Sequence, residues 1–257
     1  KEASLQPVHV WLQVPSCVPS WPGFETPGEE MTAELVEEAM QWDNVIGLGE
    51  MMNYNGVAAG DPMILDELEA TRRAGKVIGG HYASPDLGKL FHAYAAGGAA
   101  DDHEGTRLED AVARLRQGMR PMLRYSSAWH DVAAQVPAIT RLGLDPHRFI
   151  LCTDDSHAGT LVNDGHMDRT IRHAIDQGLP AMTAVQMATI NTAEHFGLSQ
   201  QVGMIAPGRW ADILLVKDLQ HFHSALVVAR GKVAARNETL LIDLPRMEYP
   251  KWATASV

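Results

Sequence analysis

Short apolar runs alternate with longer segments of helical periodicity through the first two hundred residues of the chain. The predicted strands are runs of apolar or small residues: 8–14, 45–48, 77–81, 98–100, 121–124 and 149–153. The segments between them place apolar residues at helical spacing, and glycines such as Gly75 and Gly118 follow the last turn. Strands that alternate with helices are typical of βα units, so we predict an α/β fold with parallel strands.

The pattern changes after Leu198. The segments GMIAPGRWADILLV and ALVVARGKVAARN alternate apolar and polar residues and contain frequent glycines, which is typical of antiparallel β structure. We therefore predict that a second, smaller domain begins near Gln201. Three helix starts are predicted from N-terminal capping patterns: Ser84 with Pro85, Thr106 with Glu109, and Thr183.

Polar residues with metal-binding side chains follow four of the predicted strands. Glu50 follows VIGLG, His81 follows VIGG, His103 follows AAGGAADD, and Asp154 follows FILCT. Catalytic groups of parallel barrels gather at the carboxyl ends of the strands, so we expect these four side chains to converge. They suit a divalent transition metal, which would make water a usable nucleophile near neutral pH. We expect the adjacent Asp155 to orient a histidine or to face the substrate.

The other polar candidates have structural interpretations. A single histidine after an apolar strand is more often a hydrogen-bonding residue than a ligand, so the joint placement of the four residues carries the metal prediction. The structural interpretations are these: Asp101 and Asp102 as a solvated loop, Glu104 as a helix-start acid, Asp155 as a helix N-cap, His157, His166 and His173 as surface or loop residues, and His221 and His223 as surface histidines.

Composition narrows the class of protein. The formal net charge of −11, from 32 acidic and 21 basic residues spread along the chain, argues against a nucleic-acid-binding surface. The two cysteines, Cys17 and Cys152, are typical of a reduced, cytoplasmic protein without disulfides. No apolar run approaches the roughly 20 residues of a membrane span, so we expect no membrane partner.

Eight segments, in order and spacing, resemble the adenine deaminase family of the amidohydrolase superfamily. They are VPSCVPS (14–20), GLGEMMNYNGV (47–57), GGH (79–81), DHE (102–104), CTDD (152–155), DGHMD (164–168), MATINTAEHFGL (187–198) and IAPGRWADILL (205–215). The resemblance implies hydrolytic deamination of adenine, a small purine base, to hypoxanthine and ammonia. It also implies a binuclear centre of Mn, Fe or Zn, and we expect a homo-oligomer.

The resemblance also implies roles for the strand-end residues. Glu50 would bridge two metals, His81 and His103 would be ligands from barrel strands five and six, and Asp154 would bind metal and shuttle the proton of the attacking water. Residues 1–200 would then hold strands three to eight of a TIM-like (β/α)8 barrel, and residues 201–257 part of a small β-sandwich domain and a tail. The His-x-His pair of the first strand does not occur, so we expect a central portion of a longer chain.

Two departures from the family pattern leave the exact base specificity open. Tyr82 follows His81 where the family tends to have Ala-Pro, and Tyr125 lies in RYSSA where the family tends to have an Arg-Glu-Gly-Ser run. One alternative function is another amidohydrolase reaction, on a modified purine or a cyclic amide. The other is a non-catalytic fragment that lacks the first-strand His-x-His pair.

Overall fold

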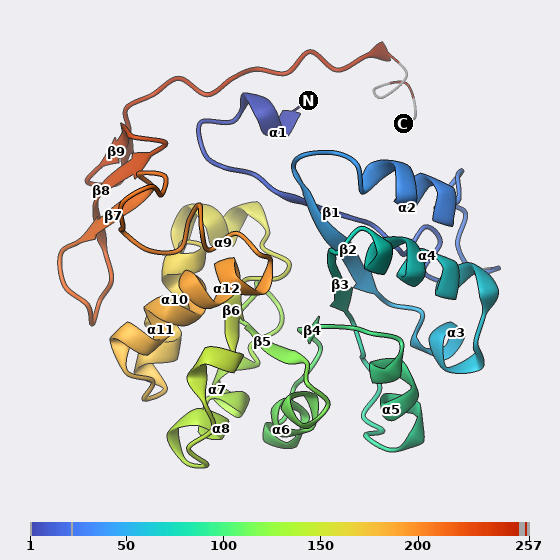
Figure 1. Ribbon diagram of the computed structural model, residues 1–257. Helices are drawn as coiled ribbons and strands as arrows, with labels where there is room; N and C mark the ends of the chain where they lie inside the picture. Colours follow the sequence, from blue (N-terminus) through green and yellow to red (C-terminus); the bar gives the residue numbers. More distant parts are fainter. Residues whose placement is uncertain (1, 22, 252–254, 256–257) are drawn as a thin grey trace.

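The computed structural model describes residues 2–21, 23–251 and 255. Within these residues, parallel strands form two three-stranded sheets, with the orders β1-β2-β3 and β4-β5-β6. Their bounds are β1 Leu12–Val14, β2 Val45–Met51, β3 Val77–Gly80, β4 Asp101–Asp102, β5 Arg120–Arg124 and β6 Ile150–Cys152. The sheets adjoin at β3 and β4, where the Ala100 N–H donates to the Ile78 carbonyl over 2.9 Å. Figure 1 shows the six strands as a central arc, as predicted for strands of a β/α barrel.

Helices lie outside this arc of strands (Figure 1). Their bounds are α1 Glu2–Leu5, α2 Ala33–Ala39, α3 Tyr54–Ala59, α4 Pro62–Arg73, α5 Lys89–Ala96, α6 Leu108–Arg116, α7 Val132–Gln135, α8 Pro137–Thr140, α9 Ala158–Asn163, α10 Met167–Asp176, α11 Ala181–Ala188 and α12 Ile190–His195, with a 3₁₀ helix at Pro146–Arg148. From β1 to β6, each strand is followed by at least one helix before the next strand, as the periodicity predicts. No helix of the described residues is both long and apolar enough to cross a membrane.

Several helices and strands begin at other residues than predicted. Three helices begin at Lys89, Leu108 and Ala181, and not at the predicted Ser84, Thr106 and Thr183. Before α6, the Asp110 carboxylate, and not that of Glu109, accepts the N–H groups of Thr106 and Arg107. The strand predicted over 98–100 is the two-residue β4, which begins at Asp101. The predicted helix ends at Gly75 and Gly118 are confirmed, and both glycines have positive φ.

Apolar side chains form two core clusters, one under each parallel sheet. The first includes Leu48 and Tyr94 beside β2 and β3, and the second includes Leu123 and Phe149 beside β5 and β6. The acidic side chain of Glu67 on α4 is also buried, with 2% of its surface exposed. Because the strand ends emerge from these packed clusters, the backbone that carries their polar side chains is held in place.

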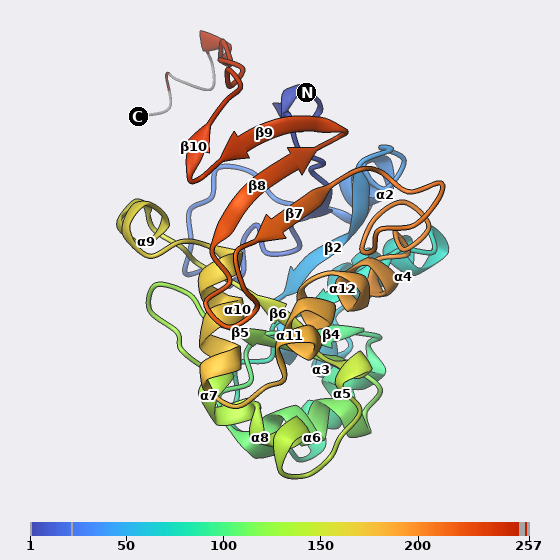
Figure 2. The ribbon, with the colours of Figure 1, turned by 90° about the vertical axis from the view of Figure 1, so that its left-hand side faces the viewer.

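Four strands between residues 213 and 240 form a separate antiparallel sheet with the order β10-β9-β8-β7 (Figure 2). Its strands are β7 Ile213–Val216, β8 Ser224–Ala229, β9 Lys232–Arg236 and β10 Thr239–Leu240. The antiparallel structure expected from the alternating pattern is confirmed. The domain boundary near residue 201 and the assignment of this domain to a β-sandwich stay predictions. His221 and His223 are exposed on the connection before β8, as expected of surface histidines.

Candidate metal centre and active site

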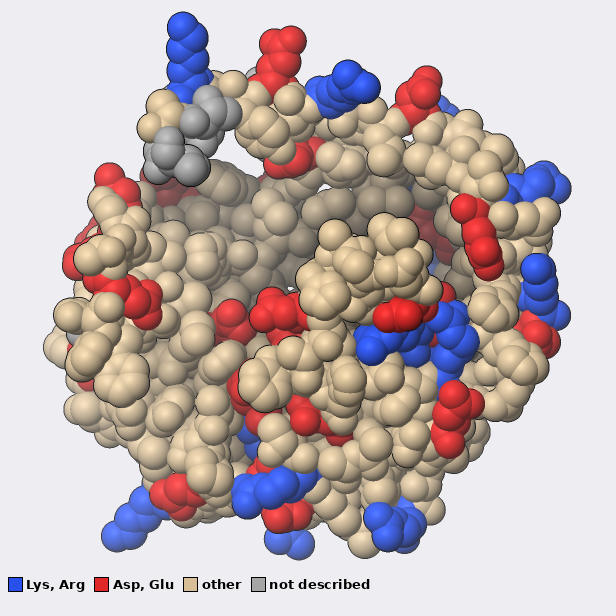
Figure 3. All heavy atoms as spheres, turned by 180° about the vertical axis from the view of Figure 1, so that it is seen from behind, with Lys and Arg blue, Asp and Glu red and all other residues tan. Residues whose placement is uncertain are grey.

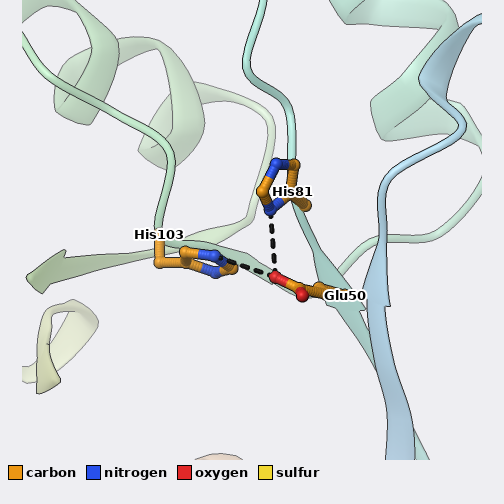
Figure 4. A group of neighbouring side chains, drawn as sticks. All are labelled: Glu50, His81 and His103. Carbon is orange, nitrogen blue, oxygen red and sulfur yellow. Dashed lines mark hydrogen bonds and ion pairs between the residues drawn. The ribbon is translucent and has the colours of Figure 1, made fainter. Parts of the chain in front are cut away.

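Three of the four predicted ligands lie together at the ends of neighbouring strands (Figure 4). Glu50 is near the end of β2, His81 follows β3, and His103 follows β4. The Glu50 Oε2 atom lies 3.0 Å from His81 Nδ1 and 3.1 Å from His103 Nε2. The two imidazole rings meet edge to face, with centroids 5.1 Å apart. The parallel strands therefore bring together residues that are far apart in the sequence.

The charge balance of this group suits a cation. Hydrogen bonds from His103 and His81 hold the pKa of Glu50 well below its ordinary value, so this carboxylate is ionised. Burial lowers the pKa of His103, but its bond to Glu50 and the nearby negative charges outweigh burial and leave the pKa raised. One carboxylate oxygen and two imidazole nitrogens, all within 4.8 Å of one another, are a donor set that fits a divalent transition metal.

Asp154 belongs to a second group, with His103 and Glu104. It follows β6 and has φ of 55°, in the left-handed region that aspartate tolerates better than most residues. The buried Arg124 guanidinium at the end of β5 lies 2.9 Å from Asp154 Oδ2 and also donates to Glu104. On its other side it donates to Asp131 over 2.6 Å. Arg124 thus holds Glu104 and Asp154 side by side next to His103.

The interpretation of Glu104 as a helix-start acid is wrong. Glu104 precedes α6 and points to the strand-end group, with Oε1 3.5 Å from His103 Nε2 and 3.7 Å from His81 Nδ1. Arg124 is a further site residue that was not predicted. Two sequence features indicate these residues. Glu104 directly follows the candidate ligand His103, and Arg124 is the last residue of a predicted strand, close to where the other site residues lie on their strands.

The interpretation of Asp101 and Asp102 as a solvated loop is also wrong. Their exposed fractions are 3% and 1%, because each has a buried partner. Asp101 pairs with His195 of α12, and Asp102 Oδ1 lies 3.2 Å from Arg114 Nη2 of α6. Burial raises the pKa of Asp102 in spite of Arg114. Both acids fix backbone around the site and are not surface charges.

The two tyrosines at which the chain departs from the family pattern are packed structural residues. Tyr82 has no exposed surface, and its hydroxyl donates to the Asp86 carbonyl. The Tyr125 ring stacks on His173 of α10, with ring centroids 3.9 Å apart and planes within 4°. His173 lies within α10 and its Nε2 atom is buried, so the expectation that it is a surface or loop residue is wrong.

The remaining predicted residues stay close to expectation. His157 is the exposed N-cap of α9, and its Nδ1 accepts the N–H of Thr160. His166 is exposed before α10. Asp155 is exposed, and its carbonyl accepts the Ser127 N–H over 2.9 Å. Its predicted role of orienting a histidine or substrate stays a prediction.

A pocket of about 330 Å³ adjoins two of the metal-ligand candidates. Glu50 and His103 line it, together with Gln13, Cys17 and Met122. Burial raises the pKa of the Cys17 thiol, with the Glu50 charge as the next cause, so this cysteine is a neutral lining group. Figure 3, seen from behind Figure 1, shows acidic side chains gathered beside a hollow near the middle of this face. Because Glu50 and His103 line this pocket, a small ligand in it would lie against both side chains.

Residues 1–234 match the model of the Amidohydrolase family. The chain belongs to this family. Among curated proteins it is 59% identical over 256 residues to Adenine deaminase 3 of Rhizobium meliloti (strain 1021), covering 100% of this chain and 43% of that protein. It is 47% identical over 251 residues to Adenine deaminase of Moorella thermoacetica (strain ATCC 39073 / JCM 9320), covering 98% and 42%. The amidohydrolase chain thus spans less than half the length of these curated relatives.

Solved structures confirm the amidohydrolase fold at much lower identity. A β-aspartyl dipeptidase from Fervidobacterium islandicum AW-1 matches with a TM-score of 0.60 and 17% identity, over 84% of this chain and 63% of that chain. The structure of enamidase matches with a TM-score of 0.59 and 16% identity, over 81% and 60%. The expected α/β amidohydrolase architecture, with a separate antiparallel sheet, is therefore confirmed.

Proposed function

We propose that the protein catalyses the hydrolytic deamination of adenine to hypoxanthine and ammonia, with divalent transition metal held by Glu50, His81 and His103. The observation that carries the proposal is that the imidazole nitrogens of His81 and His103 both lie within 3.1 Å of one Glu50 oxygen. The curated relatives named adenine deaminase, which are 47–60% identical to the chain, support the choice of base. We further propose a binuclear centre of Mn, Fe or Zn, with Glu50 as the bridging ligand and Asp154 as a fourth ligand.

In the proposed reaction, water adds to C6 of the ring and the exocyclic amine leaves as ammonia. Metal at this site would supply the positive charge that lowers the pKa of water and stabilises negative charge in the transition state. Asp154 would accept the proton of the attacking water and return it to the leaving amine. Because Asp154 is held 2.9 Å from Arg124, its carboxylate keeps one orientation while the proton moves. Asp155 would orient a histidine or a substrate nitrogen.

We also propose that the protein is cytoplasmic and forms a homo-oligomer. Its substrate is a small neutral purine, which agrees with a site formed by strand-end loops of an acidic protein.

Product analysis tests the choice of reaction. The metal-loaded protein is incubated separately with adenine, N6-methyladenine and hydantoin, and the products are separated by chromatography. Hypoxanthine and ammonia formed fastest from adenine would support the proposal. Faster release of methylamine from N6-methyladenine, or ring opening of hydantoin, would replace it by the modified-purine or cyclic-amide reaction. No reaction with any of the three would support a non-catalytic chain.

A further inference from the structure

One buried hydroxyl joins the strands that carry Glu50 and His81. Tyr94 of α5 has 1% of its surface exposed, and its hydroxyl donates to the Met51 carbonyl over 2.9 Å. The same oxygen accepts the backbone N–H of His81 over 2.8 Å. Met51 directly follows Glu50, so this single atom bonds to the backbone at or next to each of the two ligand positions.

The regular pairing of these strands fails where the ligands lie. Along β2 and β3, Leu48 pairs with Ile78, but the register shifts before the next pair, Met51 with Gly80. β3 ends at Gly80, so the N–H of His81 has no partner in the strand ladder. A buried backbone N–H without a partner is costly, and the Tyr94 hydroxyl supplies the missing acceptor.

Neighbouring contacts fix the other side of the same backbone. The Gly80 N–H donates to Asp101 Oδ1 over 3.1 Å, and the Tyr82 N–H donates to Asp102 Oδ2 over 2.8 Å. These two bonds tie the segment to β4. A Cβ atom at Gly80 would lie 2.1 Å from the Asp101 carbonyl oxygen, so the approach of β3 to β4 requires glycine. The bond to Tyr94 is the corresponding tie toward β2.

We propose that Tyr94 is a positioning residue that holds Glu50 and His81 at metal-binding separation. This inference rests on the proposed metal site. It follows from the two bonds of one hydroxyl and from the shifted register between the strands. With the hydroxyl present, His81 Nδ1 stays 3.0 Å from Glu50 Oε2. Without it, both backbone positions lose a shared anchor, and the two side chains gain freedom that metal binding must restrict.

The test compares two buried tyrosines, Tyr94 and Tyr82, whose ring centroids are 5.3 Å apart. Tyr94→Phe removes the hydroxyl that bridges β2 and β3 and keeps the ring. Tyr82→Phe is the matched control, because its hydroxyl is bonded to the Asp86 carbonyl, outside the strand pair. The dissociation constants for Zn²⁺ and Mn²⁺ are measured by chelator competition for both variants and for the unmodified protein. The urea midpoint of each metal-free protein is measured alongside.

We expect Tyr94→Phe to weaken metal binding by about 10-fold to 100-fold, the usual effect of losing a hydrogen bond that holds a metal ligand in place. Tyr82→Phe should keep the dissociation constant within about two-fold of that of the unmodified protein. This holds even if its urea midpoint falls as far as that of Tyr94→Phe. Saturating metal should restore the adenine kcat of Tyr94→Phe. Equal dissociation constants for the two variants would overturn the positioning role while leaving the metal site intact. An unmodified protein that binds neither metal would overturn the proposed site itself, and the inference with it.

Discussion

The buried carboxyl group of Glu67 predicts a measurable pH dependence of stability. Glu67 on α4 is 2% exposed, and its Oε2 atom has no hydrogen-bond partner. Burial, with the Asp61 charge as a smaller cause, raises its pKa from 4.5 to about 7. Below pH 4.5 the group is protonated in both the folded and the unfolded chain. Between pH 4.5 and 7 only the folded chain keeps the proton, so stability falls as the pH rises and the full loss is present above pH 7.

The size of the loss follows from the two pKa values. The difference between 4.5 and about 7 corresponds to about 3 kcal/mol of unfolding free energy. Glu67→Gln keeps the shape of the side chain but cannot ionise. We expect the variant to match the unmodified protein near pH 4.5 and to be more stable by up to about 3 kcal/mol at pH 8.

Urea denaturation at both pH values measures this difference. Asp66→Asn is the control, because it also removes an acid from α4, at an exposed position next in the chain. The control should leave the pH dependence of the midpoint unchanged. If Glu67→Gln gains no stability at pH 8 relative to the unmodified protein, then the group is ionised in the folded chain at little cost. The burial argument would then be wrong.

Two further predictions concern the site. Asp154→Asn should lower turnover by roughly 10² to 10⁴ with some loss of metal, because it removes the proposed proton acceptor, whereas Asp155→Asn should cost less and keep its metal. Steady-state kinetics and elemental analysis check both, and the reverse pattern would mean that the two acids have exchanged roles. His81→Ala and His103→Ala should each lose metal with little change in helix content by circular dichroism, while His221→Ala keeps it. Unchanged metal in both strand-end variants would remove those histidines from the ligand set.

Strand-end placement predicted the group of Glu50, His81 and His103 because it depends on a single rule. Parallel strands of one sheet present their carboxyl ends on the same side, so polar residues directly after apolar runs must meet there. The order of strands and helices followed in the same way from periodicity. The antiparallel sheet after residue 212 was visible in its alternating pattern.

The partners of the buried acids could not be predicted because they lie on other elements of the fold. Two adjacent aspartates normally indicate a solvated loop, and only the fold brings His195 to Asp101 and Arg114 to Asp102. The same holds for Arg124, whose contact with Glu104 joins the ends of separate strands. Tyr94 has the helical spacing of an ordinary core residue, and nothing local shows that its hydroxyl reaches His81.

The most direct test is the formation of hypoxanthine from adenine by the protein before and after metal removal. The protein is stripped with a chelator, and then Mn²⁺, Fe²⁺ or Zn²⁺ is added back under conditions that keep iron reduced. We predict no turnover in the stripped protein and restored turnover with at least one of these metals. Full turnover in the stripped protein, or none with any metal, would contradict metal-dependent deamination of adenine at Glu50, His81 and His103.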